Sequence, residues 1–147
     1  MEMRKARPGD VEPVMAIAEE AYAPYVAIIG RPPAPMVADF AEAEAAGQLH
    51  VLEREGEIVA YIHLYPKGDV LHIENLAVMP ALRRQGIARR LLDFAEAQAA
   101  ALGIGVLDLY TNEVMESAQS LYLATGFDEV ERREEAGFRR VYLRKTL

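Results

Sequence analysis

The first residues of this sequence that could bind a ligand form a basic turn in an otherwise acidic chain. Residues Arg83-Arg84-Gln85-Gly86-Ile87-Ala88, followed directly by Arg89 and Arg90, lie in a sequence of 147 residues with a formal net charge of −7. Gly86 and Ala88 carry little side-chain bulk, so another molecule could approach the backbone closely there. A basic island of this kind suits a small polyanionic ligand.

The basic turn is predicted to join a strand to a helix. Val70–Val78 is rich in β-branched and apolar residues and is ended by Pro80, as expected of a strand. A helix from Gly86 to Gly103 is predicted by apolar residues at helical spacing, namely Ile87, Leu91, Ala95, Ala99 and Leu102. The first backbone N–H groups of a helix have no internal partner and carry the positive end of its dipole. We therefore predict that the backbone N–H groups from Gln85 to Ala88 cradle a diphosphate.

The arginines near this turn have two interpretations. Arg83 and Arg84 flank the cradle and could pair with phosphates, because a guanidinium matches them in a bidentate way. Arg89 could instead pair with Asp93 four residues on, and both Arg89 and Arg90 could be solvated surface residues.

A second group of reactive side chains is expected on two neighbouring strands, Glu57–Tyr65 and Val70–Val78. A four-residue turn at Pro66–Asp69 would pair Tyr65 with Val70 and place His63 opposite His72. Because side chains alternate along a strand, one face would then carry Tyr61, His63, His72, Glu74 and Leu76. A carboxylate in the middle of a sheet is costly unless it is partnered or used. Both a hydrogen-bonded sheet face and a reactive face stay open, and a bulge would shift the register.

These residues resemble those of the GNAT family of N-acetyltransferases. Arg83-Arg84-Gln85-Gly86-Ile87-Ala88 matches the family signature (Gln/Arg)-x-x-Gly-x-(Gly/Ala), whose turn wraps the pyrophosphate of acetyl-CoA. The preceding Leu76-Ala77-Val78 and the later Leu121-Tyr122-x-x-x-Gly126-Phe127 follow in the family's order and spacing. The resemblance spans essentially the whole chain. It implies an enzyme that transfers the acetyl group of acetyl-CoA to a primary amine of a small molecule, amino acid or peptide, by direct attack in a ternary complex.

The resemblance assigns the cofactor contacts to the basic turn and the strand before it. Backbone groups around Leu76 to Val78 would bind the pantetheine arm, and the Val78 N–H would polarise the thioester carbonyl as an oxyanion hole does. Asn112 could hydrogen-bond to the pantetheine or the acceptor, or simply cap a turn. Ala118 stands where many relatives carry Asn, so one contact is expected to be missing. The predicted cofactor-binding residues are Leu76, Ala77, Val78, Arg83, Arg84, Gln85, Gly86, Ile87, Ala88, Arg89 and Asn112.

The resemblance also implies two catalytic residues. Glu74 is the expected general base, directly or through water, because it lies on the strand that enters the splayed part of the sheet. His72, two residues away, is the second choice. Tyr122 falls where the family's tyrosine approaches the CoA sulfur as general acid, whereas without the resemblance it would be interpreted as a core aromatic residue.

The acceptor site is expected between the connection of the first two helices and the final hairpin. Arg31, held among prolines, could meet a carboxylate of an amino acid or peptide, although a solvated surface arginine is the alternative. The candidate wall residues are Tyr22, Tyr25, Arg31, Phe138 and Arg139. The predicted substrate-binding residues are Tyr25, Arg31 and His72.

Composition narrows the classes of function. A chain of 147 residues predicts a single domain over residues 1–147. The absence of cysteine excludes disulfides, thiolate metal sites and a cysteine nucleophile. The acidic balance argues against a nucleic-acid partner, and no apolar run approaches the roughly 20 residues of a membrane helix. The N-terminus lacks the apolar core of a signal peptide, so we expect a cytoplasmic protein. The partner that the resemblance implies is a small-molecule or peptide amine acceptor. A homodimer is compatible with the sequence.

The order of predicted elements is β-α-α-β-β-β-α-β-α-β-β. It predicts a mixed α/β fold with a largely antiparallel sheet of about six or seven strands and about four helices. This is also the order of the GNAT fold, in which the sheet is splayed between the fourth and fifth strands. The remaining predicted elements are the strands Met3–Ala6, Leu49–Arg54 and Val106–Thr111, helices that begin at Asp10 and span Met36–Ala46 and Ser117–Ala124, and a hairpin of Asp128–Arg133 with Phe138–Lys145.

Two other classes of function stay open. His63, His72 and Glu74 could form a metal site with two histidines and one carboxylate. Adjacent strand positions seldom close such a site and it leaves the basic turn unexplained, so no metal is expected. The chain could also be a CoA-binding sensor without catalysis, although Glu74 and Tyr122 are both present. A serine hydrolase is excluded because the sequence contains no Gly-x-Ser-x-Gly.

Overall fold

The computed structural model describes all 147 residues and contains one twisted sheet of seven strands, in the order β1-β2-β3-β4-β5-β7-β6. All neighbouring strands are antiparallel except β4 and β5, which are parallel. The strands are β1 (Glu2–Lys5), β2 (Leu49–Arg54), β3 (Glu57–Lys67), β4 (Val70–Val78), β5 (Val106–Asn112), β6 (Asp128–Glu135) and β7 (Phe138–Thr146). The mixed α/β fold with a largely antiparallel sheet is therefore confirmed.

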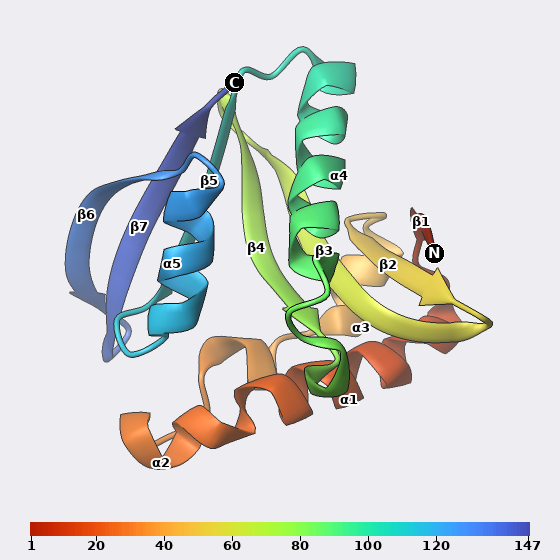
Figure 1. Cartoon of the computed structure of the whole chain (residues 1–147), viewed down its shortest axis with the longest axis horizontal. Helices are drawn as coiled ribbons and strands as arrows, with labels where there is room; N and C mark the ends of the chain where they lie inside the picture. The colour runs from red at the N-terminus through yellow and green to blue at the C-terminus, as the bar shows by residue number, and fades with distance from the viewer.

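Helices cover the two faces of the sheet (Figure 1). The longest, α4 (Ile87–Leu102), lies on one face with α5 (Glu116–Ala124), and α1 (Val11–Tyr22) with α3 (Phe40–Ala45) lies on the other. A single turn, α2 (Val26–Ile29), extends α1, and short 3-10 turns occupy η1 (Pro8–Asp10), η2 (Ala23–Tyr25), η3 (Ala34–Val37) and η4 (Pro80–Leu82). The predicted helix Met36–Ala46 is thus two pieces, because Asp39 begins α3 by accepting the Glu42 N–H with its side chain.

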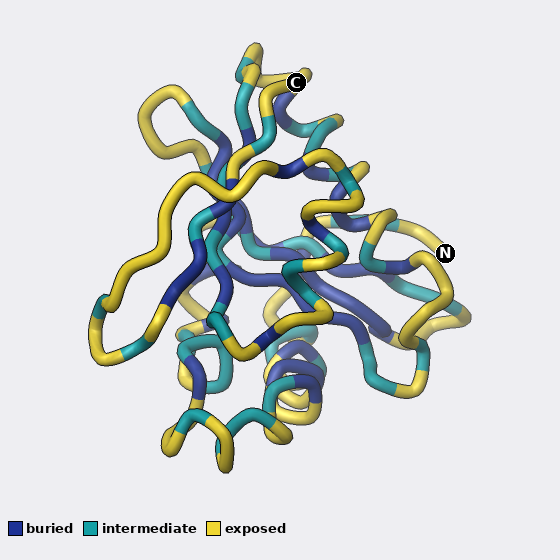
Figure 2. The backbone as a smooth tube through the Cα atoms, turned by 60° about the vertical axis from the view of Figure 1, so that its left-hand side comes forward, coloured by how far each residue is buried: buried dark blue, intermediate teal, exposed yellow.

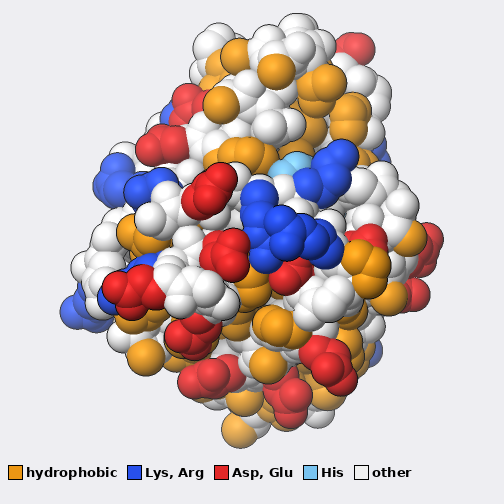
Figure 3. All heavy atoms as spheres, turned by 90° about the vertical axis from the view of Figure 1, so that its right-hand side faces the viewer, with side chains coloured by type: hydrophobic (Ala, Val, Ile, Leu, Met, Phe, Trp, Pro, Cys, Tyr) orange, Lys and Arg blue, Asp and Glu red, His pale blue; other side chains and the backbone are white.

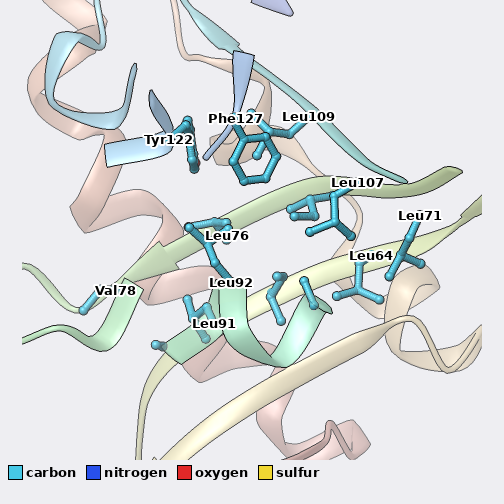
Figure 4. Close-up of a cluster of buried hydrophobic side chains, with 14 of the residues drawn as sticks. Leu64, Leu71, Leu76, Val78, Leu91, Leu92, Leu107, Leu109, Tyr122 and Phe127 are labelled. Carbon is cyan, nitrogen blue, oxygen red and sulfur yellow. The ribbon is translucent and has the colours of Figure 1, made fainter. Parts of the chain in front are cut away.

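Two hydrophobic cores hold these layers together, and Figure 2 shows the buried backbone concentrated in the central strands. Figure 4 shows the core under α4 and α5, where Leu76 lies beneath Tyr122 and Phe127. The second core packs α1 and α3 onto β2 and β3, and α1 contributes Val14, Ile17, Ala18 and Ala21 to it. At the β1 edge, basic and acidic side chains intermingle on the surface (Figure 3), and there Arg4 pairs with both Asp10 and Glu53.

The predicted register of β3 against β4 is wrong. Their hairpin turns through two residues, so Lys67 pairs with Val70 and Tyr65 pairs with His72. Gly68, at the first position of this loop, has φ +61°, which two-residue hairpin loops favour. The expected four-residue turn would have placed His63 opposite His72.

A bulge in β4 shifts the pairing of β3 with β4 again. His63 pairs with Asn75 and Leu64 with Ile73, so Glu74 has no partner of its own. Beyond the bulge, side chains switch faces. Leu76 therefore joins the core under α4, and Tyr61 instead hydrogen-bonds to Asn75. Of the residues predicted to share one face, Tyr61, His63, His72 and Glu74 do lie on the side of β3 and β4 that carries Tyr65, and only Leu76 lies on the other side.

Candidate active site

The site lies where β4 and β5 separate. Only Leu71, His72 and Ile73 of β4 pair with β5, and beyond them the two strands diverge, as Figure 1 shows below their meeting point near the C-terminus. The Met79 N–H donates to the Val59 carbonyl on β3 at 2.8 Å. Because backbone groups alternate between the two edges of a strand, the Val78 N–H points to the opposite edge, where β5 has moved away.

A cavity of about 630 Å³ runs along this edge toward the basic turn. Arg84 and Gly86 both have positive φ, +64° and +78°, so the turn coils tightly before α4 begins. The first N–H groups of α4 have no partner within the helix. The residues that were predicted to bind the cofactor and that line this cavity are Leu76, Ala77, Val78, Arg83, Arg84, Gly86, Ile87, Ala88 and Arg89.

Four polar residues with a predicted cofactor role differ in where the structure places them, and two of them, Arg83 and Asn112, make hydrogen bonds within the protein. Arg83 donates to the Ala21 carbonyl at 3.2 Å and so ties the turn to α1. Asn112 accepts the Val114 N–H at 3.1 Å, which is the turn cap, and it lines the neighbouring cavity instead of this one. Gln85 lines neither cavity. Arg89 makes no ion pair with Asp93.

A smaller cavity of about 110 Å³ adjoins the first. The two share five lining residues, so they meet in the gap between β4 and β5, at Tyr22, Leu76, Met115, Ala118 and Tyr122. The hydroxyl of Tyr22 donates to the Leu76 carbonyl at 2.8 Å, which fixes this part of β4 to α1. One ligand could therefore extend along β4 while a second approaches its end from the smaller cavity.

Tyr122 lies at this junction. Its ring is buried against Phe127, with the ring centroids 5.7 Å apart (Figure 4). Burial raises the pKa of its phenol well above the usual range, so the phenol keeps its proton at neutral pH. Its hydroxyl makes no hydrogen bond to the protein, whereas that of Tyr22 does. Tyr122 is thus a protonated group that faces both cavities.

Glu74, exposed by the bulge, lines the smaller cavity and belongs to a chain of hydrogen bonds. His72 contacts Asp108 through Nδ1 at 2.7 Å and Glu74 through Nε2 at 2.8 Å, and the Tyr65 hydroxyl donates to the same Glu74 oxygen at 3.1 Å. The other oxygen of Glu74, Oε1, makes no hydrogen bond to the protein. Glu74 therefore has one fixed oxygen and one free oxygen.

His72 sets the charges in this chain of hydrogen bonds. Burial would lower the pKa of His72, but its hydrogen bonds to Asp108 and Glu74 outweigh burial and raise this pKa to about 9. The hydrogen bond from His72 in turn lowers the pKa of Glu74. At neutral pH the group is thus an imidazolium between two carboxylates, with a net charge of −1. Glu74, the expected base, is therefore ionised, and its hydrogen bond to His72 holds the carboxylate in position.

The other end of the smaller cavity is basic. Arg140 is buried, stacks on Tyr110 at 4.3 Å and pairs with Glu135 at 2.7 Å. Sequence reasoning chose Arg139, which is exposed and pairs with Glu113 outside the cavity. The choice was wrong because alternate residues of β7 face opposite sides. A signal existed, since Arg140 lies in phase with Phe138, the other expected wall residue, which does line the cavity.

The predicted substrate-binding residues do not line the smaller cavity. Tyr25 lines the larger one, and His72 touches the acceptor side only through Glu74. Arg31 hydrogen-bonds to the Ala136 carbonyl and stacks on Phe138 at 3.8 Å, so it joins the loop after α2 to the β6–β7 hairpin. Its guanidinium is thus already engaged within the protein.

Most of the buried polar side chains of the molecule lie at the smaller cavity. The buried polar or charged side chains of the whole molecule are His72, Asn75, Thr111 and Arg140. Three of them line the smaller cavity, and His72 holds Glu74. Burial of polar groups costs stability unless they are satisfied, so their concentration singles out this site. His63, which entered only the alternative of a metal site, instead hydrogen-bonds to Gln48, and no group of three or more His, Asp or Glu residues is arranged to hold a metal.

The fold is that of acetyltransferases of the GNAT type. The family model described as "Acetyltransferase (GNAT) family" matches residues 14–127, so this chain belongs to the GNAT family, whose acetyl donor is acetyl-CoA. No helix of the structure is long and apolar enough to cross a membrane.

Two kinds of relative accompany this match. The chain is 33% identical over 82 residues to the aminoalkylphosphonate N-acetyltransferase of Salmonella typhimurium, covering 52% of this chain and 53% of that protein. It is 40% identical over 67 residues to the amino-acid acetyltransferase of Azotobacter vinelandii, covering 44% of this chain and 16% of that protein. The matches thus span about half or less of these relatives.

Solved structures share the fold along the whole chain. The PaiA N-acetyltransferase of Thermoplasma acidophilum in complex with coenzyme A superposes with a TM-score of 0.84 at 17% identity, covering 99% of this chain and 98% of that one. The ribosomal-protein-alanine N-acetyltransferase of Brucella melitensis gives a TM-score of 0.76 at 19% identity, with 100% of both chains covered.

Proposed function

We propose that this protein transfers the acetyl group of acetyl-CoA to a primary amine by direct attack in a ternary complex. One observation carries the proposal. The larger cavity at the basic turn and the smaller cavity beside Glu74 meet at Tyr122, inside the gap between β4 and β5. Donor and acceptor could therefore be bound together, each from its own side.

The larger cavity suits acetyl-CoA along its length. The free N–H groups at the start of α4 and the arginines of the turn would hold the diphosphate. The pantetheine arm would lie against the unpaired edge of β4. There the Val78 N–H is available to the thioester oxygen, and a donor so placed stabilises the charge that develops during acyl transfer.

The proposed reaction needs two proton movements. The amine nitrogen forms a bond to the acetyl carbon, and the bond from that carbon to sulfur breaks. The amine loses a proton to Glu74, directly or through a water molecule, while the leaving thiolate takes a proton from Tyr122. The lowered pKa of Glu74 keeps it ionised, so before the reaction it can also hold the ammonium form of the acceptor. That form must first release one proton to solvent to give the neutral amine that attacks, and the second proton then passes to Glu74.

The acceptor is expected to be a small molecule, an amino acid or a peptide. The matched relatives include proteins named for an aminoalkylphosphonate and for amino acids, which supports the smaller acceptors. The volume of the acceptor cavity, about 110 Å³ against about 630 Å³ for its neighbour, points the same way.

Thermal melting with and without acetyl-CoA tests the donor site. A ligand at about 100 times its dissociation constant adds roughly 2.7 kcal/mol to folded-state stability, so a clear upward shift is expected. Release of free CoA thiol in the presence of amines then tests catalysis. A shift without thiol release from any amine would favour a CoA-binding sensor, and no shift at millimolar acetyl-CoA would contradict the proposal at its first step.

A further inference from the structure

The acceptor cavity has one negative and one positive end. Its lining includes a single carboxylate, Glu74, and a single cationic side chain, Arg140. The strand order β4-β5-β7 places β5 between them. On β5 the ring of Tyr110 lies between the His72 ring, 6.2 Å away, and the Arg140 guanidinium, 4.3 Å away. The two charges thus stand on opposite sides of one tyrosine.

Arg140 retains capacity to bind a ligand. Its Nη1 pairs with Glu135, while Nη2 and Nε make no hydrogen bond to the protein. Glu135 is shared, because it also accepts from Arg133 and from the Tyr142 hydroxyl at 2.8 Å. The partner of Arg140 is therefore divided among three donors, and Glu135 itself does not line the acceptor cavity.

A rigid frame keeps the Arg140 guanidinium in place. It stacks between Tyr110 and Phe138, at 4.3 and 5.4 Å from the ring centroids. Phe138 is in turn covered by Arg31, which is bonded to the Ala136 carbonyl. A buried guanidinium with free donors, held in one orientation, is well suited to a carboxylate or phosphonate.

We propose that the acceptor is a small dipolar amine, with an anionic group a short chain away from the amino group. Arg140 binds the anion and Glu74 faces the amino group. This inference rests on the proposed function, since it names the acceptor class of the same site. It disfavours diamines and polyamines, because their second cation would face the like charge of the buried Arg140 guanidinium.

The test compares acceptors of similar size that differ in charge. Initial rates of thiol release give kcat/KM for β-alanine, aminoethylphosphonate, propylamine and ethylenediamine at saturating acetyl-CoA. We expect β-alanine or aminoethylphosphonate to exceed propylamine by at least about tenfold, and ethylenediamine to be the poorest. The better of the two anionic amines identifies the anion as carboxylate or phosphonate.

Three variants assign the preference to its residue. Arg140→Gln should reduce the ratio of anionic to neutral amine to near one, and Arg140→Lys should restore part of it because the charge remains. Arg139→Gln is the matched control, since Arg139 is the adjacent arginine but pairs with Glu113 outside the cavity. It should keep the ratio of the unaltered protein. Melting curves establish that each variant is folded.

Two results would overturn the inference. One is a ratio near one in the unaltered protein, and the other is a ratio that Arg140→Gln leaves intact. Calorimetric binding of β-alanine and propylamine to the CoA-loaded protein separates this inference from the proposed function. Binding of β-alanine that depends on Arg140, without turnover, would retain the dipolar site and reject the acetyltransferase. Absence of both binding and turnover for either anionic amine would reject the dipolar site.

Discussion

Nε2 of His72 lies 2.8 Å from the Glu74 carboxylate, while Nδ1 of the same ring lies 2.7 Å from Asp108. One imidazolium therefore orients the proposed base and lowers its pKa. The arrangement favours a carboxylate that is fixed and ionised over one with high basicity. It also links the stability of the fold to the state of the site.

Stability should depend on the protonation of His72. Its pKa is about 9 in the folded protein against 6.5 in the unfolded chain. A raised folded pKa gives stability that is fully present below pH 6.5 and is lost as pH rises through about 9. We expect the free energy of urea unfolding of the unaltered protein to fall by about 3 kcal/mol over this interval, and His72→Gln to remove most of that dependence. The control is His63→Gln, because burial lowers the pKa of His63 and the sign is opposite. An identical pH profile in His72→Gln and the unaltered protein would contradict the hydrogen-bonded chain.

Replacement of Glu74 should affect turnover more than donor binding. Glu74→Gln keeps the shape of the side chain but removes the negative charge and the proton acceptor. General-base catalysis contributes on the order of 10²–10⁴ in rate, so kcat should fall within that range. The shift in melting temperature caused by acetyl-CoA should be unchanged, since Glu74 does not line the larger cavity. A variant with full activity would exclude Glu74 as base.

The two tyrosines at the junction should separate catalysis from structure. Tyr122→Phe should lower kcat by about tenfold or more with little loss of stability, because the Tyr122 hydroxyl bonds to no protein group. Tyr22→Phe removes the hydrogen bond to the Leu76 carbonyl and should cost about 1 kcal/mol of unfolding free energy. Unaltered kcat in Tyr122→Phe would remove this residue from the mechanism.

The basic turn can be tested against the other end of the same helix. Gly86 precedes α4 with φ +78° and Gly103 follows it with φ +71°, and a Cβ at either position would meet open space. Glutamate at either position should cost about 1–2 kcal/mol through backbone strain. Only Gly86→Glu should abolish the acetyl-CoA melting shift, because it adds bulk and negative charge to the diphosphate site. Equal acetyl-CoA affinity in the two variants would argue against that site.

The sequence predicted the parts of this structure that depend on local pattern. Val70–Val78 and the helix up to Leu102 appear with the expected bounds, because hydrophobic period, Pro80 and Gly103 act within a few residues. The basic turn was predictable for the same reason. Most of the residues assigned to the cofactor line one cavity.

Contacts that depend on strand register were not predictable in this way. A two-residue loop at Gly68 and a bulge at Glu74 each shift the pairing of β3 with β4. The loop did have a sequence signal, because Gly followed by Asp favours a two-residue hairpin, whereas the bulge has none. The His72–Asp108 contact requires the parallel pairing of β4 with β5, over a helix of 16 residues. The choice between Arg139 and Arg140 depends on which face of β7 turns inward. The strand register, the His72–Asp108 contact and the inward face of β7 together form the acceptor side of the site, and the last two depend on residues far apart in the sequence.

The short seam between β4 and β5 has a mechanical consequence. Within the sheet, three residue pairs are the only strand pairing between a half-sheet of four strands and one of three. A pantetheine arm in the gap would hydrogen-bond to the free edge of β4 and pack against the side of β5, and so would add contacts between the two half-sheets where strand pairing ends. Amide hydrogens on both halves would then exchange more slowly in concert, although the ligand touches few of them.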